Sequence, residues 1–233
     1  MTDPIKIIAK EEYLKKNKEP KQEEVWDNIS DLWVEFKKKP FFSVEDFLSE
    51  KKGLVIDLGC GSGRNMIANP NITYYGIDFS NKQLECARKS VSEKGINARF
   101  FKSGADKLPN EFKDNMFDYG LFIATLHCIE DPKDREKALK EFYRVLKPKA
   151  EALITIWNSE DPRFKDVNFH GDTYMSWRKD GKEYYRYYYL FSKEEFLDLL
   201  KSAGFIIEEV KTKDSFKDRF SKKNWIVRVQ KTK

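Results

Sequence analysis

Blocks of apolar residues in this 233-residue chain alternate between the spacing of strands and the spacing of helices. The run at 54–58 holds branched apolar residues and one acid, which is typical of a strand buried on both faces. Further strands are predicted at 73–77, 98–102 and 117–124, and the segment 146–157 predicts a turn followed by a fifth strand. Helical spacing is found at 79–95, 134–146 and 192–204. This alternation predicts an α/β fold, a mostly parallel sheet with right-handed crossovers and helices on its faces.

Two short apolar runs near the C-terminus, 206–210 and 225–230, are predicted to close the sheet as an antiparallel pair. The sheet then has seven strands. The first crossover is unusual, because the segment 64–68 is short for a helix and is ended by asparagines and a proline. The chain is long enough for one α/β domain with a modest insertion, and we expect 23–233 to be that domain.

The N-terminal region shows a different pattern. Residues 1–22 are rich in Lys and Glu and are predicted to form a loose arm. From 23 to 36, apolar residues recur at spacings of three and four, which predicts an amphipathic helix across the edge of the ligand site. After Pro40, Ser43 together with Asp46 predicts the start of a second helix, over 44–50.

The first strand runs directly into Gly59, Gly61 and Gly63. Glycines at alternate positions allow positive φ and leave one side of the loop without side chains, so a ligand can lie on the backbone N–H groups. Twenty-one residues after Asp57, the second strand ends in Asp78, where a doubly wound sheet places a carboxylate that holds ribose hydroxyls. The pattern predicts a site for a flat or anionic small molecule. The alternative is a glycine turn that only closes a βα unit.

The order D-x-G-x-G-x-G followed by an acid resembles the class I S-adenosylmethionine-dependent methyltransferases, not the G-x-G-x-x-G of dinucleotide enzymes. The resemblance implies a Rossmann-like fold and S-adenosyl-L-methionine as cofactor, with the glycines around its methionine part and Asp78 on its ribose. It also implies that Asp106, after the third strand, meets the adenine amino group; an ordinary helix cap is the alternative. The implied cofactor-binding residues are Asp57, Gly59, Cys60, Gly61, Gly63, Asp78, Phe79, Ala105, Asp106, Ile123 and Ala124.

Composition limits the partners, the metal sites and the cell compartment that we expect for this chain. Hydrophobic residues make up 40% of the chain and charged residues 36%, and 44 basic against 39 acidic residues leave a net charge of +5. Such a balance hints at an anionic partner. The three cysteines, Cys60, Cys86 and Cys128, lack C-x-x-C spacing, which argues against a disulfide framework and a structural zinc site. With no apolar run near 18 residues and no leader-like start, we expect a cytoplasmic protein without a membrane partner or a metal.

The segment 158–190 has no apolar period, but its many Tyr, Trp and Phe residues lie among Arg and Lys. We interpret it as an insertion before the last helix. Aromatic faces and positive charges are how unpaired RNA bases and phosphates are held. A tyrosine-rich lid packed on its own domain is the alternative. Arg186 stands out because a guanidinium can bind a carboxylate in two-pronged fashion. His127, at the end of the fourth strand, is a candidate base or orienting group, and a packed histidine is the alternative.

Several segments within 25–205 resemble the tRNA wobble-uridine methyltransferases that esterify 5-carboxymethyluridine. They are VWDNISDLW, FKKKPFFSVEDFL, VIDLGCGSGRNMIANPNITYYGIDFS, FIATLHCIED, YMSW and YYRYYYLFSKEEFLDLL. RYYYLF at 186–191 is the most specific, since it is similar to the R-Y-Y-H-L-Y run of that family. The resemblance implies a tRNA substrate, no DNA partner, and commonly a small zinc-binding activator protein.

By the same resemblance Arg186 and Tyr187 face the acceptor, His127 lies close by, and Lys37 stands where the family has arginine. Three further positions depart from the family pattern, Phe41 in place of Trp and Cys128 and Tyr189 in place of His. A carboxymethyl carboxylate is already anionic at neutral pH, so we expect His127 to position it and Arg186 or Lys37 to bind it. Rival interpretations are a small-molecule methyltransferase with a tyrosine-rich lid, a noncatalytic RNA-binding protein, and a dehydrogenase, which the glycine spacing disfavours.

Overall fold

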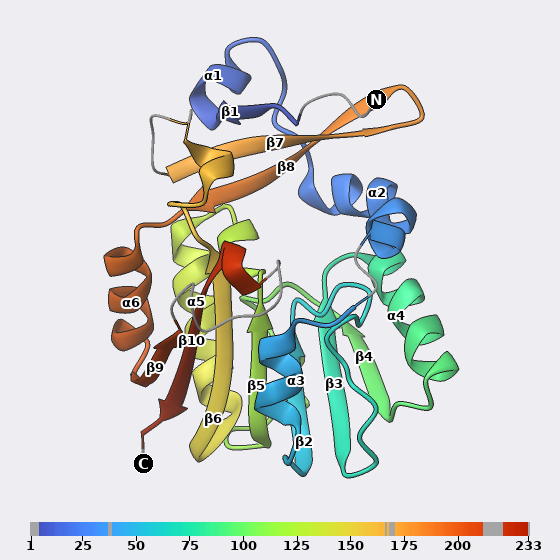
Figure 1. Cartoon of the computed structure of the whole chain (residues 1–233), viewed down its shortest axis with the longest axis vertical. Coiled ribbons are helices and arrows are strands. Elements are labelled where there is room, and N and C mark those ends of the chain that lie inside the picture. The colour runs from blue at the N-terminus through green and yellow to red at the C-terminus, as the bar shows by residue number, and fades with distance from the viewer. Residues whose placement is uncertain (1–4, 37–38, 166, 168–170, 212–220, 233) are drawn as a thin grey trace.

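The computed structural model describes residues 5–36, 39–165, 167, 171–211 and 221–232 (Figure 1). The main sheet is built from β2 Gly53–Leu58, β3 Ile72–Asp78, β4 Ala98–Lys102, β5 Phe117–Ile123, β6 Leu146–Trp157, β9 Phe205–Lys211 and β10 Asn224–Lys231. Their order is β4-β3-β2-β5-β6-β10-β9, with the first five parallel and β10 antiparallel to both neighbours. The predicted α/β sheet of seven strands, including its closing antiparallel pair, is confirmed.

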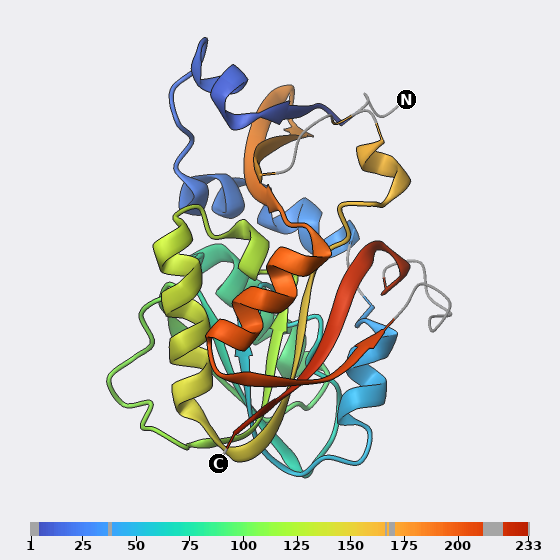
Figure 2. The same cartoon turned by 90° about the vertical axis from the view of Figure 1, so that its left-hand side faces the viewer.

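Helices cover both faces of this sheet (Figure 2). On one face, α5 Pro132–Val145 and α6 Lys193–Ser202 bury apolar residues against the sheet, among them Leu139, Phe142 and Phe196. On the other face, α3 Phe42–Leu48 and α4 Asn81–Glu93 do the same with residues such as Val44 and Leu84. The core is therefore divided by the sheet into two layers, as a doubly wound fold requires.

The crossover between β2 and β3 contains no helix, in agreement with the prediction that 64–68 is short for one. The turn at 69–71 ends the segment before a helical turn can be repeated. Instead α3, which precedes β2, supplies Val44, Phe47 and Leu48 to this side of the core. Its predicted cap is wrong: Phe41 is the N-cap residue without a side-chain hydrogen bond, and Ser43 lies inside the helix.

A second, smaller sheet lies above the ends of the central strands in Figure 1. It consists of β1 Ile7–Ala9, β7 Gly171–Lys179 and β8 Lys182–Leu190, and α1 Lys10–Leu14 packs against it. The prediction of a loose arm over 1–22 is wrong for its described part, because β1 pairs antiparallel with β7. Within the segment 158–190, residues 171–190 form a regular hairpin, in which Tyr174, Tyr187 and Tyr188 are buried.

The helix predicted at 23–36 is confirmed as α2 Gln22–Phe36. It lies between the small sheet and the main sheet. From this helix, the Asp27 carboxylate accepts hydrogen bonds from Ser80 Oγ (2.5 Å) and from the Lys82 backbone N–H (3.2 Å) at the start of α4. A carboxylate at a helix N-terminus is favoured by the helix dipole. This contact fixes α2 over the loop that follows β3.

Candidate active site

A cleft opens where β2, β3 and β5 end, at the point where neighbouring strands turn to opposite faces of the sheet. Doubly wound sheets bind ligands at this place. The cleft has two adjoining halves of roughly 700 and 690 Å³ of open space, both lined by Gly59, Asp78, Phe79, Thr125 and Cys128. One half continues to Ser103, Gly104, Ala105 and Asp106, and the other to Trp26, Trp33, Phe41, Ser62, Arg64, Asn65 and Gln83.

The glycine loop forms the floor of the cleft. Gly59 has φ +72°, and a Cβ atom there would lie 2.1 Å from Thr125 Cγ2, so no other residue fits without displacement. Thr125 Oγ1 donates a hydrogen bond to the Gly59 carbonyl (3.1 Å), which ties the loop to the end of β5. Gly61 also has positive φ, at +52°. These conformations leave the backbone open toward the cleft, as the sequence predicts.

Two buried carboxylates support this floor. Asp78 accepts hydrogen bonds from the backbone N–H groups of Gly61 (2.8 Å) and Ser80 (2.9 Å). Burial nevertheless raises the pKa of Asp78 to about 6, since the two hydrogen bonds only partly compensate for lost hydration. Burial, with the neighbouring charge of Asp78, raises the pKa of Asp57 to about 7. Asp57 is 1% exposed, its Oδ2 has no hydrogen-bond partner, and the residue does not line the cleft.

The buried Asp57 leads to a prediction about pH. Because its folded pKa lies above the ordinary 3.8, the folded chain keeps this proton between about pH 4 and 7 while the unfolded chain releases it. The resulting stabilisation is complete below pH 4 and is lost as pH rises through 7. Asp57→Asn removes the titration, so the wild type should lose roughly 2–4 kcal/mol more unfolding free energy than the variant between pH 4 and 8. Urea unfolding at both pH values measures this, and parallel losses would contradict it.

The outer wall of the cleft is aromatic and comes from α2. Trp26 and Trp33 are two helical turns apart and therefore share one face, and their rings meet edge to face at 5.2 Å. The rings of Trp33 and Trp177, on β7, are 5.4 Å apart. Phe41, 4% exposed, adds another ring to the lining. This helix therefore lines the cleft in which the sequence predicts the ligand.

Arg186 lies directly behind this aromatic wall. Its guanidinium is 5.0 Å from the ring centroids of both Trp33 and Trp177 and 5.4 Å from that of Tyr188. It donates hydrogen bonds to Tyr188 Oη (2.9 Å) and to the Ser176 carbonyl (3.4 Å), and its Nε has no partner. The residue is 2% exposed, and among the described residues no carboxylate lies within ion-pair distance of it. Aromatic faces and two neutral hydrogen-bond acceptors offset this buried charge.

His127 lies in the short 3-10 helix η1 Leu126–Cys128 and is 1% exposed. Its ring is stacked 5.5 Å from that of Tyr188 and tilted at 5.1 Å from that of Trp157. Neither His127 nor Arg186 is among the residues that line the two halves of the cleft. Tyr188 contacts both, so the structure brings the two predicted residues together around one tyrosine ring. Cys128, next to His127, lines both halves.

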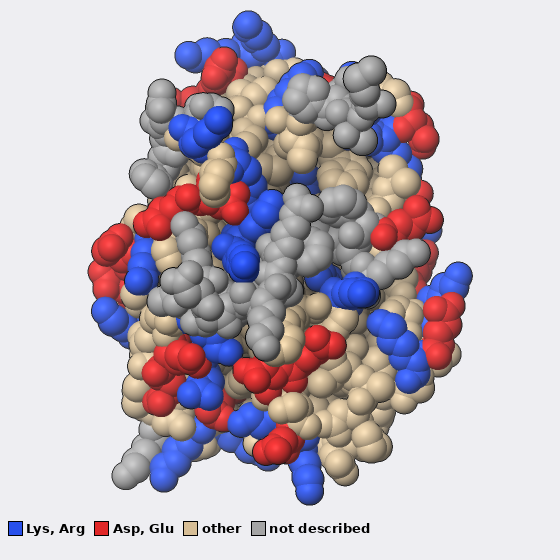
Figure 3. All heavy atoms as spheres, viewed as in Figure 1, with Lys and Arg blue, Asp and Glu red and all other residues tan. Residues whose placement is uncertain are grey.

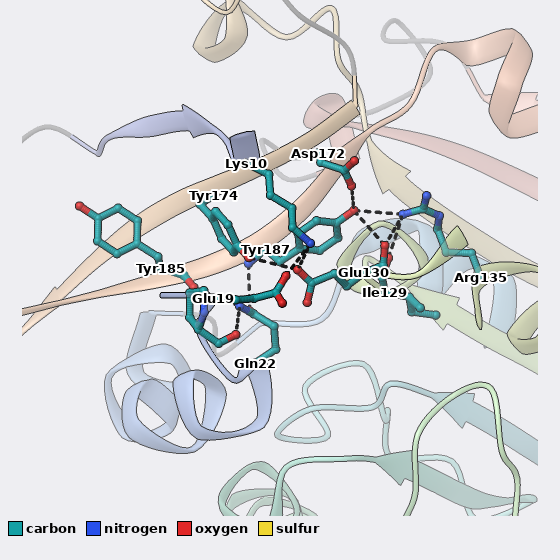
Figure 4. Close-up of polar contacts among 11 residues, drawn as sticks. Lys10, Glu19, Gln22, Ile129, Glu130, Arg135, Asp172, Tyr174, Tyr185 and Tyr187 are labelled. Carbon is teal, nitrogen blue, oxygen red and sulfur yellow. Dashed lines mark hydrogen bonds and ion pairs between the residues drawn. The ribbon is translucent and has the colours of Figure 1, made fainter. Parts of the chain in front are cut away.

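Tyr187 points to the other face of β8, as the alternation of a strand requires. Figure 4 shows its hydroxyl in a polar network, where it accepts a hydrogen bond from Arg135 (3.1 Å) and contacts the Asp172 carboxylate and the Glu130 carbonyl. Lys10 Nζ forms ion pairs with Glu130 (2.6 Å) and Glu19 in the same network. Burial raises the pKa of the Tyr187 hydroxyl above its ordinary value. Tyr187 thus joins the hairpin to the domain and does not face the cleft.

Gln22 completes this junction. Its carboxamide accepts a hydrogen bond from the Tyr187 backbone N–H (2.9 Å) and donates one to the Tyr185 carbonyl (3.2 Å), so it pairs with the open edge of β8 as a neighbouring strand would (Figure 4). Gln22 and Glu130 also line the half of the cleft that contains Asp106. The N-terminal segment therefore connects the hairpin to the ligand site, a role that its Lys/Glu-rich composition did not reveal.

Most predicted cofactor residues line the cleft: Gly59, Cys60, Gly61, Asp78, Phe79, Ala105, Asp106, Ile123 and Ala124. Asp57 and Gly63 lie behind the floor, and Lys37 is outside the described residues. The lining residues that sequence reasoning missed include Gln22, Arg64, Asn65, Gln83, Thr125 and Glu130. The glycine loop and the acids at the strand ends suit a nucleoside with a charged tail. The chain can therefore hold the predicted cofactor.

Other classes of site are not apparent in the part of the chain that the structure describes. None of its helices has the length and hydropathy needed to cross a membrane. No cluster of three or more His, Cys, Asp and Glu side chains is placed there to hold a metal ion. None of the three cysteines, all of them described, forms a disulfide, and burial raises the pKa of Cys60 well above its ordinary value.

Comparison with known proteins supports the cofactor assignment. A family described as "Methyltransferase domain" matches residues 55–149, which include the glycine loop, Asp78 and Asp106. A solved S-adenosylmethionine-dependent methyltransferase from Methanosarcina mazei shares the fold, with a TM-score of 0.65 and 24% identity over 83% of this chain and 99% of that chain.

Among curated proteins, the tRNA (carboxymethyluridine(34)-5-O)-methyltransferase of Schizosaccharomyces pombe is 27% identical over 89% of this chain and 95% of its own length. The probable tRNA methyltransferase 9B of Mus musculus is 29% identical over 58% of this chain, but the match spans only 29% of the mouse protein. Residues 55–149 thus match a methyltransferase domain, the fold is that of solved S-adenosylmethionine-dependent methyltransferases, and in sequence the chain resembles the tRNA carboxymethyluridine methyltransferases.

Proposed function

We propose that the chain methylates the carboxylate of 5-carboxymethyluridine, or of a related base, at the wobble position of tRNA. The fission yeast relative whose name states this reaction matches nearly the whole length of both chains. The observation that carries the proposal is Arg186, a buried guanidinium without a carboxylate partner among the described residues, directly behind the wall of the cleft. Leaving a charge buried and unpaired destabilises a fold, so an anionic ligand is the expected complement.

The Trp33 ring separates Arg186 from the open cleft in this structure. We therefore propose that the acceptor enters by displacing Trp33 from the guanidinium, after which the acceptor carboxylate pairs with Arg186 and the base lies among the tryptophan rings. Stacking of a base on an aromatic ring contributes about 1–3 kcal/mol. The acceptor carboxylate would replace the Trp33 ring, so the Arg186 guanidinium would have a partner both before and after the acceptor binds.

The residues suit methyl transfer to a group that is already anionic. S-adenosylmethionine, when bound, would supply an electrophilic methyl group, which a carboxylate oxygen of the acceptor would take while the sulfur kept the electron pair of the broken bond. Arg186 would hold the carboxylate in line, and no residue needs to remove a proton. His127, packed on Tyr188 beside Arg186, would fix the position of both groups. The buried aromatic surroundings exclude water from the transfer.

The buried tyrosines of the hairpin change the expected contact with RNA. Tyr174, Tyr187 and Tyr188 are each 1% exposed or less, so they form the interior of the small sheet and not a stacking surface. On the face shown in Figure 3, Lys and Arg side chains are interspersed with Asp and Glu. We propose that tRNA is recognised mainly at the flipped acceptor base, with a modest contribution from phosphate contacts.

Product analysis tests the proposal. Purified chain is incubated with methyl-labelled cofactor and with three acceptor pools, total RNA, total protein and small metabolites, and the labelled nucleoside is identified by mass. A base-labile methyl ester of carboxymethyluridine is the expected product. A label confined to the metabolite pool would favour the small-molecule alternative, in which the packed hairpin is a lid. Parallel reactions with a small zinc-binding protein from the same source test the implied activator, which stays a prediction.

A further inference from the structure

Gln83 is a buried polar residue without a role in the proposed methyl transfer. It lies in the first turn of α4, where its backbone N–H donates to Ser80 Oγ (3.1 Å), and its side chain is 2% exposed. Both polar atoms of the carboxamide, Oε1 and Nε2, are buried without a hydrogen-bond partner. A buried amide that leaves both its donor and its acceptor unsatisfied destabilises a protein, and such groups are rare in folded chains.

The position of the carboxamide shows where a partner would come from. Gln83 lines the cleft, and its Oε1 lies 3.7 Å from the place that a Cβ on Gly61 would take, so the amide is beside the bare side of the glycine loop. It lines only the half that contains Ser62, Arg64 and Asn65. The half that contains Ala105 and Asp106, where the adenine is predicted to lie, does not include it.

We propose that Gln83 binds the α-amino acid tail of S-adenosylmethionine. The tail carries a carboxylate, which accepts from Nε2, and an ammonium, which donates to Oε1, so both unsatisfied atoms gain a partner from one ligand. Ribose hydroxyls and adenine have their own predicted partners in Asp78 and Asp106. Arg64, whose guanidinium is 4.6 Å from the Phe41 ring centroid, places a positive charge in the same half. The inference rests on the cofactor and not on the proposed acceptor.

The surroundings of Gln83 argue against a purely structural role. Its neighbours on the buried face of α4, Leu84, Ala87 and Val91, are apolar. A leucine of similar size would pack on the buried face of α4 and would leave no polar atom without a hydrogen bond. A carboxamide here weakens the ligand-free chain, and only a polar ligand compensates for it.

Gln83→Leu with two ligands provides the test. By calorimetry, affinity for S-adenosylhomocysteine, which keeps the tail, should fall about tenfold to a hundredfold. Affinity for 5′-methylthioadenosine, which keeps the ribose and adenine but lacks the tail, should change less than about twofold. The melting temperature of the ligand-free chain should rise by a few degrees, because two unsatisfied atoms are removed. Gln83→Met serves as a second variant if leucine packs poorly.

Ser43→Ala is the matched control. Ser43 is also fully buried with an unpaired hydroxyl, but it lies on α3 and outside the cleft, so this change should leave the affinity for both ligands unaltered. Equal weakening of both ligands by Gln83→Leu would assign Gln83 to the ribose and overturn the proposal. Unchanged affinity for both, with a raised KM for the RNA acceptor, would overturn it in favour of the acceptor base. Neither result bears on whether the acceptor is carboxymethyluridine.

Discussion

Replacing Gly59 with alanine is expected to abolish cofactor binding and to lower the free energy of unfolding by roughly 2–5 kcal/mol. Two effects add. A residue with a Cβ pays about 1–2 kcal/mol for the left-handed conformation that Gly59 adopts. The new Cβ would also lie 2.1 Å from Thr125 Cγ2 and 2.6 Å from Thr125 Cβ, and overpacking of this kind costs about 1–3 kcal/mol. The loop must therefore move away from β5, and the floor of the cleft moves with it.

Gly95→Ala is the matched control for this prediction. Gly95 has a similar φ of +63°, but nothing lies within 4 Å of the Cβ position and the residue follows α4, outside the cleft. It should lose only the backbone contribution, about 1–2 kcal/mol, and should bind S-adenosylhomocysteine as the wild type does. Urea unfolding and calorimetry measure both variants. If Gly59→Ala lost no more stability than Gly95→Ala and still bound the ligand, the contact with Thr125 would not be what requires glycine.

The main sheet could be predicted because each of its signals is local. The run at 54–58 is apolar on both faces, Gly59 and Gly61 require positive φ, and Asp78 ends the next strand, so neighbouring residues define the strand, the turn and the acid. Where a signal depended on more distant packing, prediction was weaker. The short crossover between β2 and β3 was visible in the sequence, but the packing of α3, which precedes β2, on this side of the core was not.

The hairpin β7–β8 was not predicted, although a local signal was present. Asp180 and Gly181 both have positive φ, at 48° and 76°, and an Asp-Gly pair between alternating runs is typical of a two-residue hairpin turn. The burial of β7 and β8 does not alternate, because consecutive residues on both faces of each strand are buried, so a period of two was not visible. β1 could not be recognised at all from its three residues, since an edge strand of that length depends on the partner that it pairs with.

In the candidate site, too, some residues could be placed from local signals and others depend on packing between distant segments. The residues that follow the strand ends line the cleft, because strand ends are fixed by the sheet. Arg186 and Tyr187 are adjacent in the sequence and were expected together at the acceptor, yet a strand directs them to opposite faces. Only the structure shows that Arg186 faces the tryptophan wall and Tyr187 the network with Arg135. A resemblance in sequence identifies such residues without showing which way they point.

Arg186→Met is expected to reduce kcat/KM for a carboxylate acceptor about tenfold to a hundredfold while cofactor affinity changes less than twofold. A hydrogen bond to a charged group contributes about 1.5–3 kcal/mol, and methionine fills similar space without providing one. Because the guanidinium has no carboxylate partner among the described residues, its removal should leave the unfolding free energy within about 1 kcal/mol of the wild type. Single-turnover methylation, calorimetry and urea unfolding supply the three values.

Arg186→Lys and Arg144→Met are the controls for this prediction. Lysine keeps a charge but loses the planar fork, so part of the activity should remain. Arg144 lies on α5, outside the cleft, and pairs with Glu141 and Asp114, so Arg144→Met should lower stability and leave methylation intact. An Arg186→Met variant that lost cofactor binding and turnover in equal measure would show that the guanidinium supports the fold of the cleft. A loss of turnover alone would place the charge at the acceptor, because the donor is then bound as before.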